Sequence, residues 1–378
     1  MEKNYIITAF AVKRETPYSE MKILGKTPRE YLAQNLTADG CFSVVETDDP
    51  TAAERSKTGD FSVLLYSDMP LVTKEEIIGI CKSMVYGNLD GARIKDARIY
   101  KNNPSDIPAV INLRNENFLA VSDGQSFAEA YGILRKKILL VHIERGVIIP
   151  DLNSVSIDAD VLIKKGTYIA PNNVVKGNTV IGQNNRIESG NIIENCAIGD
   201  ENTVVQSNLS ACNIAQRNRI EACIFKDGAK IGDENIAVQS NLSGCNIAHR
   251  CSVGPFATLR EGAEIGSGCR IGDYVEIKKS VLRDGVKSAH LAYIGDAEIG
   301  QKTNVGCGTV FANYNGKIKQ KTFVGENVFI GANTNLVAPL TVGNNAFIAA
   351  GSTITENIPE NSFAIARERQ IIKERKKD

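Results

Sequence analysis

From Ile157 onward, an aliphatic residue recurs at every sixth position. The first series consists of Ile157, Ile163, Ile169, Val175, Ile181, Ile187 and Ile193, and the register resumes from Val253 to Ile277 and from Val324 to Ile354. A period of six fits neither the 3.6 of a helix nor the two of a simple strand. It is typical of short strands joined by tight turns and stacked into a solenoid. The pattern therefore predicts a mainly β chain built around a parallel β-helix.

A longer repeat lies inside this region. The segment that begins at Ile198 returns at Ile231 almost unchanged, an offset of 33 residues. The expected inward positions of the first copy are Ile198, Val204, Leu209, Ile214, Ile220 and Phe225. Six such positions correspond to two turns of a three-sided prism. A duplication of whole turns lengthens a solenoid without rotating the later coils, so we assign it no chemistry.

The first 120 or so residues have an α/β pattern. We expect strands near residues 5–10 and 61–66, and helices near residues 29–35 and 74–84. Ser126 and Glu129 match a capping box that opens a further helix, which ends near Gly146. That helix is expected to link the α/β domain to the solenoid.

Composition excludes several classes of protein. Lys plus Arg and Asp plus Glu both number 44, so no net field favours nucleic acid or an anionic membrane. The sequence has no run of eighteen apolar residues and no apolar run after Met1, which predicts a cytoplasmic protein. The nine Cys include no CxxC pair and are interpreted as reduced packing thiols without zinc.

The six-residue register is interrupted twice, between Ile277 and Ile294 and between Val305 and Val324. Insertions into a solenoid become loops, and loops often carry function. His290 falls in the first interruption, and a neutral imidazole can accept a proton from an attacking amine. On these residues alone, a catalytic His290 and a packed or solvated His290 remain equally open.

The other two His are weaker candidates. His142 lies at the end of the linker helix, where packing at the surface is expected. His249 corresponds to Gln216 in the first copy of the duplication. Neither is interpreted as catalytic.

Five motifs in the same order resemble the C-terminal half of the bacterial N-acetylglucosamine-1-phosphate uridyltransferase/glucosamine-1-phosphate acetyltransferase family. They are Gly254-Pro-Phe-Ala-Thr-Leu-Arg260, Val275-Glu-Ile-Lys278-Lys, His290-Leu-Ala-Tyr293-Ile-Gly-Asp-Ala-Glu-Ile-Gly300, Asn313-Tyr314-Asn-Gly and Leu336-Val-Ala-Pro-Leu-Thr-Val-Gly343. The close match covers residues 254–367. It implies a left-handed parallel β-helix, a homotrimer with active sites between neighbouring prisms, and acetylation of glucosamine 1-phosphate by acetyl-CoA in the UDP-N-acetylglucosamine pathway.

The resemblance also implies roles for single residues. His290 resembles the general base, Arg260 and Lys278 resemble the residues that hold the sugar phosphate, and Tyr293 and Asn304 resemble its other contacts. Acetyl-CoA would lie near Cys307, Asn313, Tyr314, Ala332, Ala350 and Arg367. Cys307 stands where the family commonly has Ala, and Ala332 where it commonly has Ser. The missing hydroxyl would weaken the coenzyme pocket by about 1 kcal/mol, too little to abolish activity.

The family's N-terminal half is a Rossmann-like uridyltransferase that opens with a glycine-rich phosphate loop. Here the first strand leads into a stretch from Ala9 to Pro17 without glycine, and a loop that carries side chains cannot approach phosphates as closely. Asp68 matches the family's magnesium ligand, whereas Ser122 replaces its partner Asn. We expect no uridyltransferase activity, with Asp68 a relic or a strand-end cap and magnesium needed only if this domain is active after all.

These observations predict four segments. A truncated nucleotidyltransferase-like α/β domain covers residues 1–121, a linker helix 122–148, the left-handed β-helix 149–358 and a basic tail 359–378. The basic residues of the tail, apart from Arg367, are interpreted as solvated. An acyltransferase for a different amino sugar and a non-catalytic trimeric scaffold or regulatory protein remain alternatives. The scaffold would need none of the residues Arg260, Lys278, His290, Tyr293, Asn304 and Asn313.

Overall fold

A computed structural model describes residues 4–106 and 108–373. The chain divides into two compact units, residues 1–140 and 141–378. The boundary falls within helix α4 (Gly124–Glu144), which is the expected linker helix. Residues 374–378 of the expected basic tail lie outside the described part of the chain.

Unit 1 is an α/β unit with one six-stranded sheet in the order β2-β1-β3-β5-β4-β6. Its strands are β1 (Ile7–Val12), β2 (Phe42–Thr47), β3 (Phe61–Tyr66), β4 (Gly91–Ile94), β5 (Ala97–Lys101) and β6 (Val110–Leu113). Its helices are α1 (Pro28–Asn35), α2 (Ala52–Arg55), α3 (Lys74–Tyr86) and the 3₁₀ helix η1 (Glu116–Phe118). β1 pairs with β2 and β3 in parallel, so the C-terminal ends of these three strands share one edge. The expected strands and helices are confirmed as β1, β3, α1 and α3.

Capping residues fix where the helices of unit 1 begin. Thr27 and Thr73 each form a capping box with the Glu three residues later, at the starts of α1 and α3. The capping box predicted at Ser126 is wrong, because Ser126 already lies within the first turn of α4. The Asp123 carboxylate accepts the Ser126 N–H at 2.8 Å, and the Ser126 hydroxyl accepts the Asp123 N–H at 3.1 Å. Ser126 thus takes the place that a Glu usually fills.

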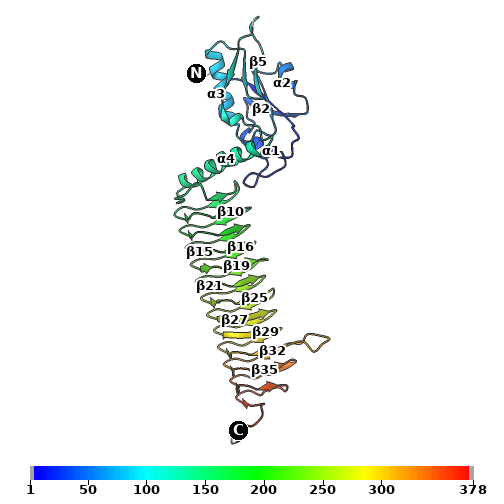
Figure 1. Cartoon of the computed structure of the whole chain (residues 1–378), viewed down its shortest axis with the longest axis vertical. Coiled ribbons are helices and arrows are strands. Elements are labelled where there is room, and N and C mark those ends of the chain that lie inside the picture. The colour runs from blue at the N-terminus through cyan, green and yellow to red at the C-terminus, as the bar shows by residue number, and fades with distance from the viewer. Residues whose placement is uncertain (1–3, 107, 374–378) are drawn as a thin grey trace, which may run out of the picture. The chain divides into compact units, whose positions relative to one another are not determined.

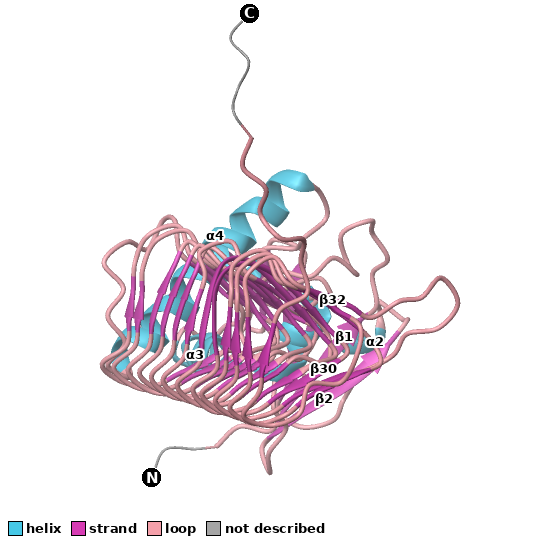
Figure 2. Cartoon of the chain, turned by 90° about the horizontal axis from the view of Figure 1, so that it is seen from below, coloured by secondary structure: helices cyan, strands magenta, loops and turns pink. Residues whose placement is uncertain are grey.

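Unit 2 is a parallel β-helix with three strands in each coil. β10 (Val174–Lys176), β11 (Val180–Ile181) and β12 (Arg186–Ile187) pair in parallel with the strands three positions later, β13 (Ile192–Glu194), β14 (Ala197–Ile198) and β15 (Thr203–Val205). Figure 1 shows these coils stacked as a ladder, and Figure 2 shows successive strands lying over one another with turns at the corners. The predicted parallel β-helix is confirmed.

The three faces of unit 2 can be followed strand by strand. The first face contains β9 (Tyr168–Ile169), β12, β15, β18 (Arg219–Glu221), β21 (Ile236–Val238), β24 (Ser252–Val253), β31 (Asn304–Val305), β34 (Phe329–Ile330), β37 (Phe347–Ile348) and β39 (Phe363–Ala364). The second contains β7 (Ser156–Ile157), β10, β13, β16 (Asn208–Ser210), β19 (Ile224–Lys226), β22 (Asn241–Ser243), β25 (Thr258–Leu259), β32 (Val310–Ala312), β35 (Asn335–Val337) and β38 (Thr353–Ile354). The third contains β8 (Leu162–Ile163), β11, β14, β17 (Asn213–Ile214), β20 (Lys230–Ile231), β23 (Asn246–Ile247), β26 (Glu264–Ile265), β28 (Val281–Leu282), β30 (Ala297–Ile299), β33 (Thr322–Val324) and β36 (Leu340–Val342).

The residues of the six-residue register point into the β-helix. Ile157, Ile187 and Ile271 are 0% exposed, and the other members of the series are also buried. A ladder of buried Asn side chains completes one corner, where the amide oxygens of Asn185, Asn202 and Asn218 accept backbone N–H groups from the following coil at 2.8 to 2.9 Å. Because these polar groups are paired, they can be buried without a large desolvation cost.

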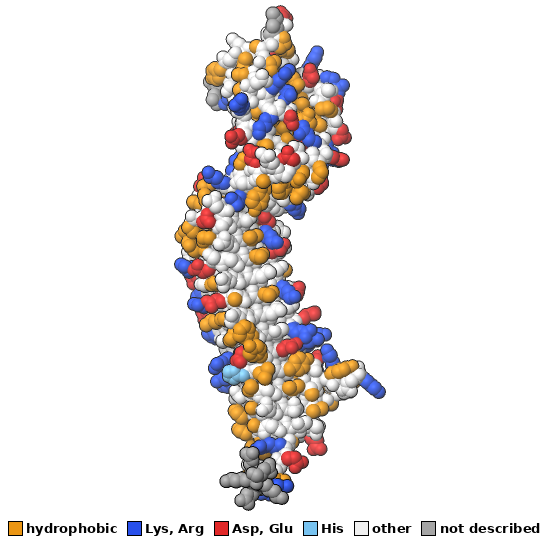
Figure 3. All heavy atoms as spheres, viewed as in Figure 1, with side chains coloured by type: hydrophobic (Ala, Val, Ile, Leu, Met, Phe, Trp, Pro, Cys, Tyr) orange, Lys and Arg blue, Asp and Glu red, His pale blue; other side chains and the backbone are white. Residues whose placement is uncertain are grey.

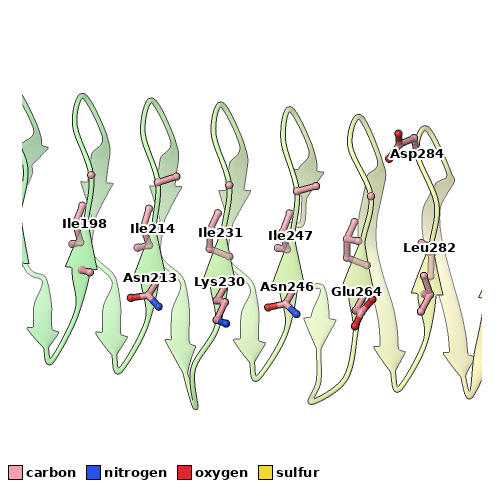
Figure 4. A pocket seen from close by; sticks show the side chains of 18 of the residues that line it. Ile198, Asn213, Ile214, Lys230, Ile231, Asn246, Ile247, Glu264, Leu282 and Asp284 are labelled. Carbon is pink, nitrogen blue, oxygen red and sulfur yellow. The ribbon is translucent and has the colours of Figure 1, made fainter.

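The internal duplication consists of two whole coils. Ile198 pairs with Ile214 on the next strand of the third face, and Ile214 pairs with Ile231 on the strand after that. Figure 4 shows Ile198, Ile214, Ile231 and Ile247 as one row on successive coils. The predicted length of two turns is confirmed.

Of the two predicted interruptions, only the second contains an inserted loop. Ile277 on β27 (Arg270–Lys278) pairs directly with Ile294 on β29 (Lys287–Gly295), so no loop is inserted there. Both strands are nine residues long and run across the first and second faces without a break. By contrast, Val305 pairs with Ile330, 25 residues later, whereas Ile330 pairs with Ile348, 18 residues later. The additional residues form a loop between β32 and β33 that projects from the coils in Figure 1.

Seven of the nine cysteines are buried, as expected of packing thiols, whereas Cys41 is half-buried and Cys307 is exposed. The described residues contain no group of three or more His, Cys, Asp or Glu placed to hold a metal ion. No described helix has both the length and the apolarity needed to cross a membrane.

Candidate active site

The corner between the first and second faces carries a column of equivalent positions. On each coil, one residue precedes a residue with a left-handed backbone, with φ of 55° at Tyr274, 27° at Leu291, 76° at Gly308, 54° at Asn333 and 73° at Gly351. The preceding residues are Asp273, His290, Cys307, Ala332 and Ala350. Backbone hydrogen bonds of 2.6 to 2.8 Å join successive coils along this corner, from Leu291 to Gly308, Cys307 to Asn333 and Ala332 to Gly351. His290 and three of the predicted coenzyme residues therefore lie along one corner.

His290 faces Asp273 on the preceding coil. The two residues are opposite each other in the parallel pairing of β29 with β27, and His290 Nδ1 lies 2.6 Å from Asp273 Oδ1. The hydrogen bond from His290 holds the pKa of Asp273 below its usual value, so the carboxylate stays ionised at neutral pH. An ionised carboxylate on Nδ1 keeps the proton there and leaves Nε2 free to accept another.

The prediction that His290 lies in a loop is wrong. His290 belongs to a continuous strand, and the side chain is 57% exposed because the residue stands at a corner of the coil. Asp273 was not predicted at all. The signal that reveals it is the offset of 17 residues between the paired Ile277 and Ile294, which also separates Asp273 from His290. His142, expected at the surface, is 3% exposed, and burial lowers its pKa.

A cluster of three cations lies at the next corner. Lys278 ends β27, Arg260 follows β25, and Lys319 belongs to the inserted loop. The pKa of Lys278 is lowered, first by the charge of Lys319 and then by that of Arg260, so the three groups are close together. Arg260 also pairs with Glu276 at 2.8 Å. Lys319 was not predicted, since the six-residue register does not extend through the loop. Such a cluster suits a dianionic phosphate.

Tyr293 and Asn313 meet beside Gly295. A Cβ atom at Gly295 would lie 2.5 Å from the Tyr293 hydroxyl and 2.8 Å from Asn313 Nδ2, so a side chain there would displace both groups. Asn313 Nδ2 also donates to Asp296 Oδ2 at 2.5 Å. Gly295 pairs with Lys278 across β27 and β29. The structure thus brings Tyr293 and Asn313 to the corner that carries the cation cluster.

Other predicted residues lie apart from His290. Asn304 is on the first face, between Lys287 and Phe329 of the neighbouring coils. Tyr314 is in the inserted loop, where its hydroxyl donates to the Gly316 carbonyl at 2.7 Å. Arg367 lies near the corner column, with its Cδ 3.7 Å from the position of a Cβ at Gly351.

Within one chain, His290 and the cation cluster are separated. His290 is five residues from Gly295, the partner of Lys278, which corresponds to roughly 16 Å along an extended strand. A small substrate cannot bridge that distance between the two backbones. The side chains that do lie on this second face between the corners include Tyr293.

A shallow hollow on the third face is a poor candidate for the site. Its lining includes Asn213, Lys230, Asn246 and Glu264, labelled in Figure 4, and none of the predicted site residues. The hollow forms over a row of small and medium side chains and presents no His or Cys. The corner with Asp273 and His290 is the better site on chemical grounds.

Comparisons with known proteins agree with this architecture. The family described as "Bacterial transferase hexapeptide (six repeats)" matches residues 244–279 and 321–356. "Bifunctional protein GlmU" of Clostridium kluyveri is 44% identical over 264 residues, covering 68% of this chain and 49% of that protein. The GlmU protein of Clostridium beijerinckii is 38% identical over 336 residues, covering 88% of this chain and 65% of that protein.

These matches identify the class and then the family. The β-helix and the hexapeptide match make the chain a hexapeptide-repeat transferase. Within that class the chain belongs to the GlmU proteins, which confirms the resemblance inferred from its motifs. The chain spans about half to two thirds of the length of these relatives. Among solved structures, a UDP-N-acetylglucosamine acyltransferase from Campylobacter jejuni is 17% identical over 56% of this chain and 71% of that chain, with a TM-score of 0.30, which supports no functional conclusion.

Proposed function

We propose that this protein transfers the acetyl group of acetyl-CoA to the amine of glucosamine 1-phosphate. The observation that carries the proposal is the Asp273–His290 pair, which lies on the same corner as Cys307, Ala332 and Ala350. A base next to a coenzyme track is what an acetyl transfer to an amine requires. The relationship to bifunctional GlmU proteins supports the same reaction.

In this mechanism His290 Nε2 removes a proton from the sugar ammonium or amine as its nitrogen attacks the thioester carbonyl carbon. The C–N bond forms and the tetrahedral intermediate expels the coenzyme thiolate, which takes the proton back from the imidazolium. Asp273 holds Nδ1–H and stabilises the transient positive charge of the ring. A backbone N–H near the Ala332 turn would stabilise the oxyanion.

The cation cluster of Arg260, Lys278 and Lys319 would bind the phosphate. Repulsion among the three groups lowers the pKa of Lys278, and a dianion between them would relieve that repulsion. The direct test is release of free thiol from acetyl-CoA with glucosamine 1-phosphate as acceptor. Release with a different amino sugar, and none with glucosamine 1-phosphate, would contradict the proposed substrate and favour the alternative acyltransferase.

We expect the protein to be a homotrimer in solution. Three apolar side chains at the catalytic corner, Phe256, Tyr274 and Leu291, are 48%, 60% and 57% exposed, and the rings of Phe256 and Tyr274 stack at 5.4 Å. Figure 3 shows further hydrophobic patches between the charged edges of unit 2. A neighbouring chain on this surface would cover them and bring its own cation cluster towards His290. Light scattering should give three times the chain mass, and a fully active stable monomer would contradict the shared site.

We also expect no uridyltransferase activity. Residues 9–17 contain no glycine to let the backbone approach nucleotide phosphates, and Arg14 turns towards Asp68 at the end of β3. The measurement is magnesium-dependent release of pyrophosphate from UTP and N-acetylglucosamine 1-phosphate. Release at an ordinary enzymatic rate of about 1 s⁻¹ or faster would show that unit 1 is active.

A further inference from the structure

A buried carboxylate without a hydrogen-bond partner lies in unit 1. Asp68 follows the end of β3 and is 0% exposed, and neither of its side-chain oxygens has a hydrogen-bond partner among the described residues. The backbone holds the residue in place, because the Val121 N–H donates to the Asp68 carbonyl at 2.8 Å. A buried charge of this kind needs a compensating cation.

The guanidinium group of Arg14 supplies that charge. The same atom, Arg14 Nη1, lies 3.6 Å from Asp68 Oδ2 and 3.1 Å from Asp96 Oδ2. The guanidinium carbon also lies 3.6 Å from the centre of the Tyr66 ring, which holds the group flat over the end of β3. Arg14 therefore stands between two carboxylates that come from different parts of the sheet.

This arrangement does not fit the magnesium ion that the resemblance implies for Asp68. Magnesium requires near-octahedral oxygen ligands at about 2.0–2.1 Å, and the space between Asp68 and Asp96 holds a guanidinium nitrogen instead. Ser122, the replacement for the second ligand, is exposed. The residues present therefore favour a bound arginine over a bound metal.

We propose that Arg14 replaces the divalent cation at this strand end, so that unit 1 is folded and stable without metal. The carboxylates of Asp68 and Asp96 then form a latent cation site that Arg14 keeps closed. Burial raises the pKa of Asp68 and the charge of Arg14 lowers it, which is consistent with a carboxylate that depends on this one neighbour.

Mn²⁺ binding to the full chain tests this proposal. Paramagnetic resonance and thermal unfolding would be measured for the parent and for R14A, R14A/D68N and R29A. Arg29 is a matched control because it pairs with Glu46 at the surface of the same unit. The parent and R29A should bind no Mn²⁺ in unit 1 at millimolar concentration. R14A should unfold at a lower temperature, regain stability with Mn²⁺, and bind the ion at least tenfold more tightly than R14A/D68N.

Two results would overturn the proposal. One is Mn²⁺ binding by the parent that D68N abolishes, because the site would then be open with Arg14 present. The other is R14A that neither binds nor is stabilised by Mn²⁺. If R14A does not fold alone, refolding with and without Mn²⁺ decides: recovery only with the ion supports a latent cation site, and no recovery in either condition excludes it.

Discussion

Replacement of His290 with alanine is expected to lower the turnover number by about 10²- to 10⁴-fold, the usual loss when general acid–base catalysis is removed. The affinity for acetyl-CoA should change little, because the corner formed by Cys307, Ala332 and Ala350 stays intact. Thiol release at saturating concentrations of both substrates gives the turnover number. Binding of the coenzyme to the variant can be measured separately by titration calorimetry.

His249 provides a matched control. It is also half exposed and also lies near a carboxylate, with Nδ1 accepting the Asp233 N–H at 3.0 Å, but it stands elsewhere on the coil. His249→Ala should keep the parental turnover number. If His290→Ala does so as well, proton removal belongs to another group or to water and the assigned mechanism fails.

The pH dependence separates catalysis from structure. Free imidazole titrates near pH ~6.5, so the parental rate should rise between about pH 6 and 8 as the imidazole and the substrate amine lose protons. His290→Ala should keep only the part due to the amine. The folded pKa of Asp273 is lowered, so its stabilising contribution is present above the usual carboxylate pKa and is lost only as the pH falls through the lowered value. Asp273 therefore stays ionised throughout the measured range, and Asp273→Asn should alter the profile through the imidazole alone.

Replacement of Lys278 with alanine is expected to raise the Michaelis constant for the sugar phosphate by about tenfold to a hundredfold, the loss expected for one charge-assisted contact to a phosphate. The turnover number should change little, since this charge contacts the phosphate in the ground state and the transition state alike. Steady-state kinetics with glucosamine 1-phosphate as the varied substrate separates the two constants.

Lys319→Ala should act in the same direction as Lys278→Ala, because Lys319 is the neighbour with the largest effect on the pKa of Lys278. Lys230→Ala is the control, since Lys230 is exposed on the third face. A Lys278→Ala variant with an unchanged Michaelis constant and a reduced turnover number would mean that Lys278 acts in catalysis instead of in phosphate binding.

Unit 2 could be predicted from its sequence because each inward position returns to the same face after a whole coil. That regularity placed Ile198, Ile214 and Ile231 in one row without any structural information. The same offset would have placed Asp273 opposite His290, but a coil with a shorter corner resembled an interruption of the register. Lys319 could not be found this way, because a loop has no period and its position depends on how the loop folds back.

Unit 1 was predicted less completely. Strands β4, β5 and β6 are only four or five residues long and alternate weakly, so their pattern does not stand out from that of loops. The contact of Arg14 with Asp68 is explained by the parallel pairing of β1 with β3, which brings the two strand ends together. The contact with Asp96 depends on the turn between β4 and β5, which the sequence did not predict.

The two coils between Ile198 and Ile231 imply that length and chemistry can change independently in this protein. Each coil adds about 4.8 Å along the axis, so the repeated segment moves the catalytic corner roughly 10 Å farther from the first coil and leaves its orientation unchanged. A gene that gains or loses such a segment by unequal recombination within its own repeats would still encode a continuous β-helix. Natural variation in the number of coils should therefore be tolerated on the N-terminal side of Arg260, and selected against between Arg260 and Arg367.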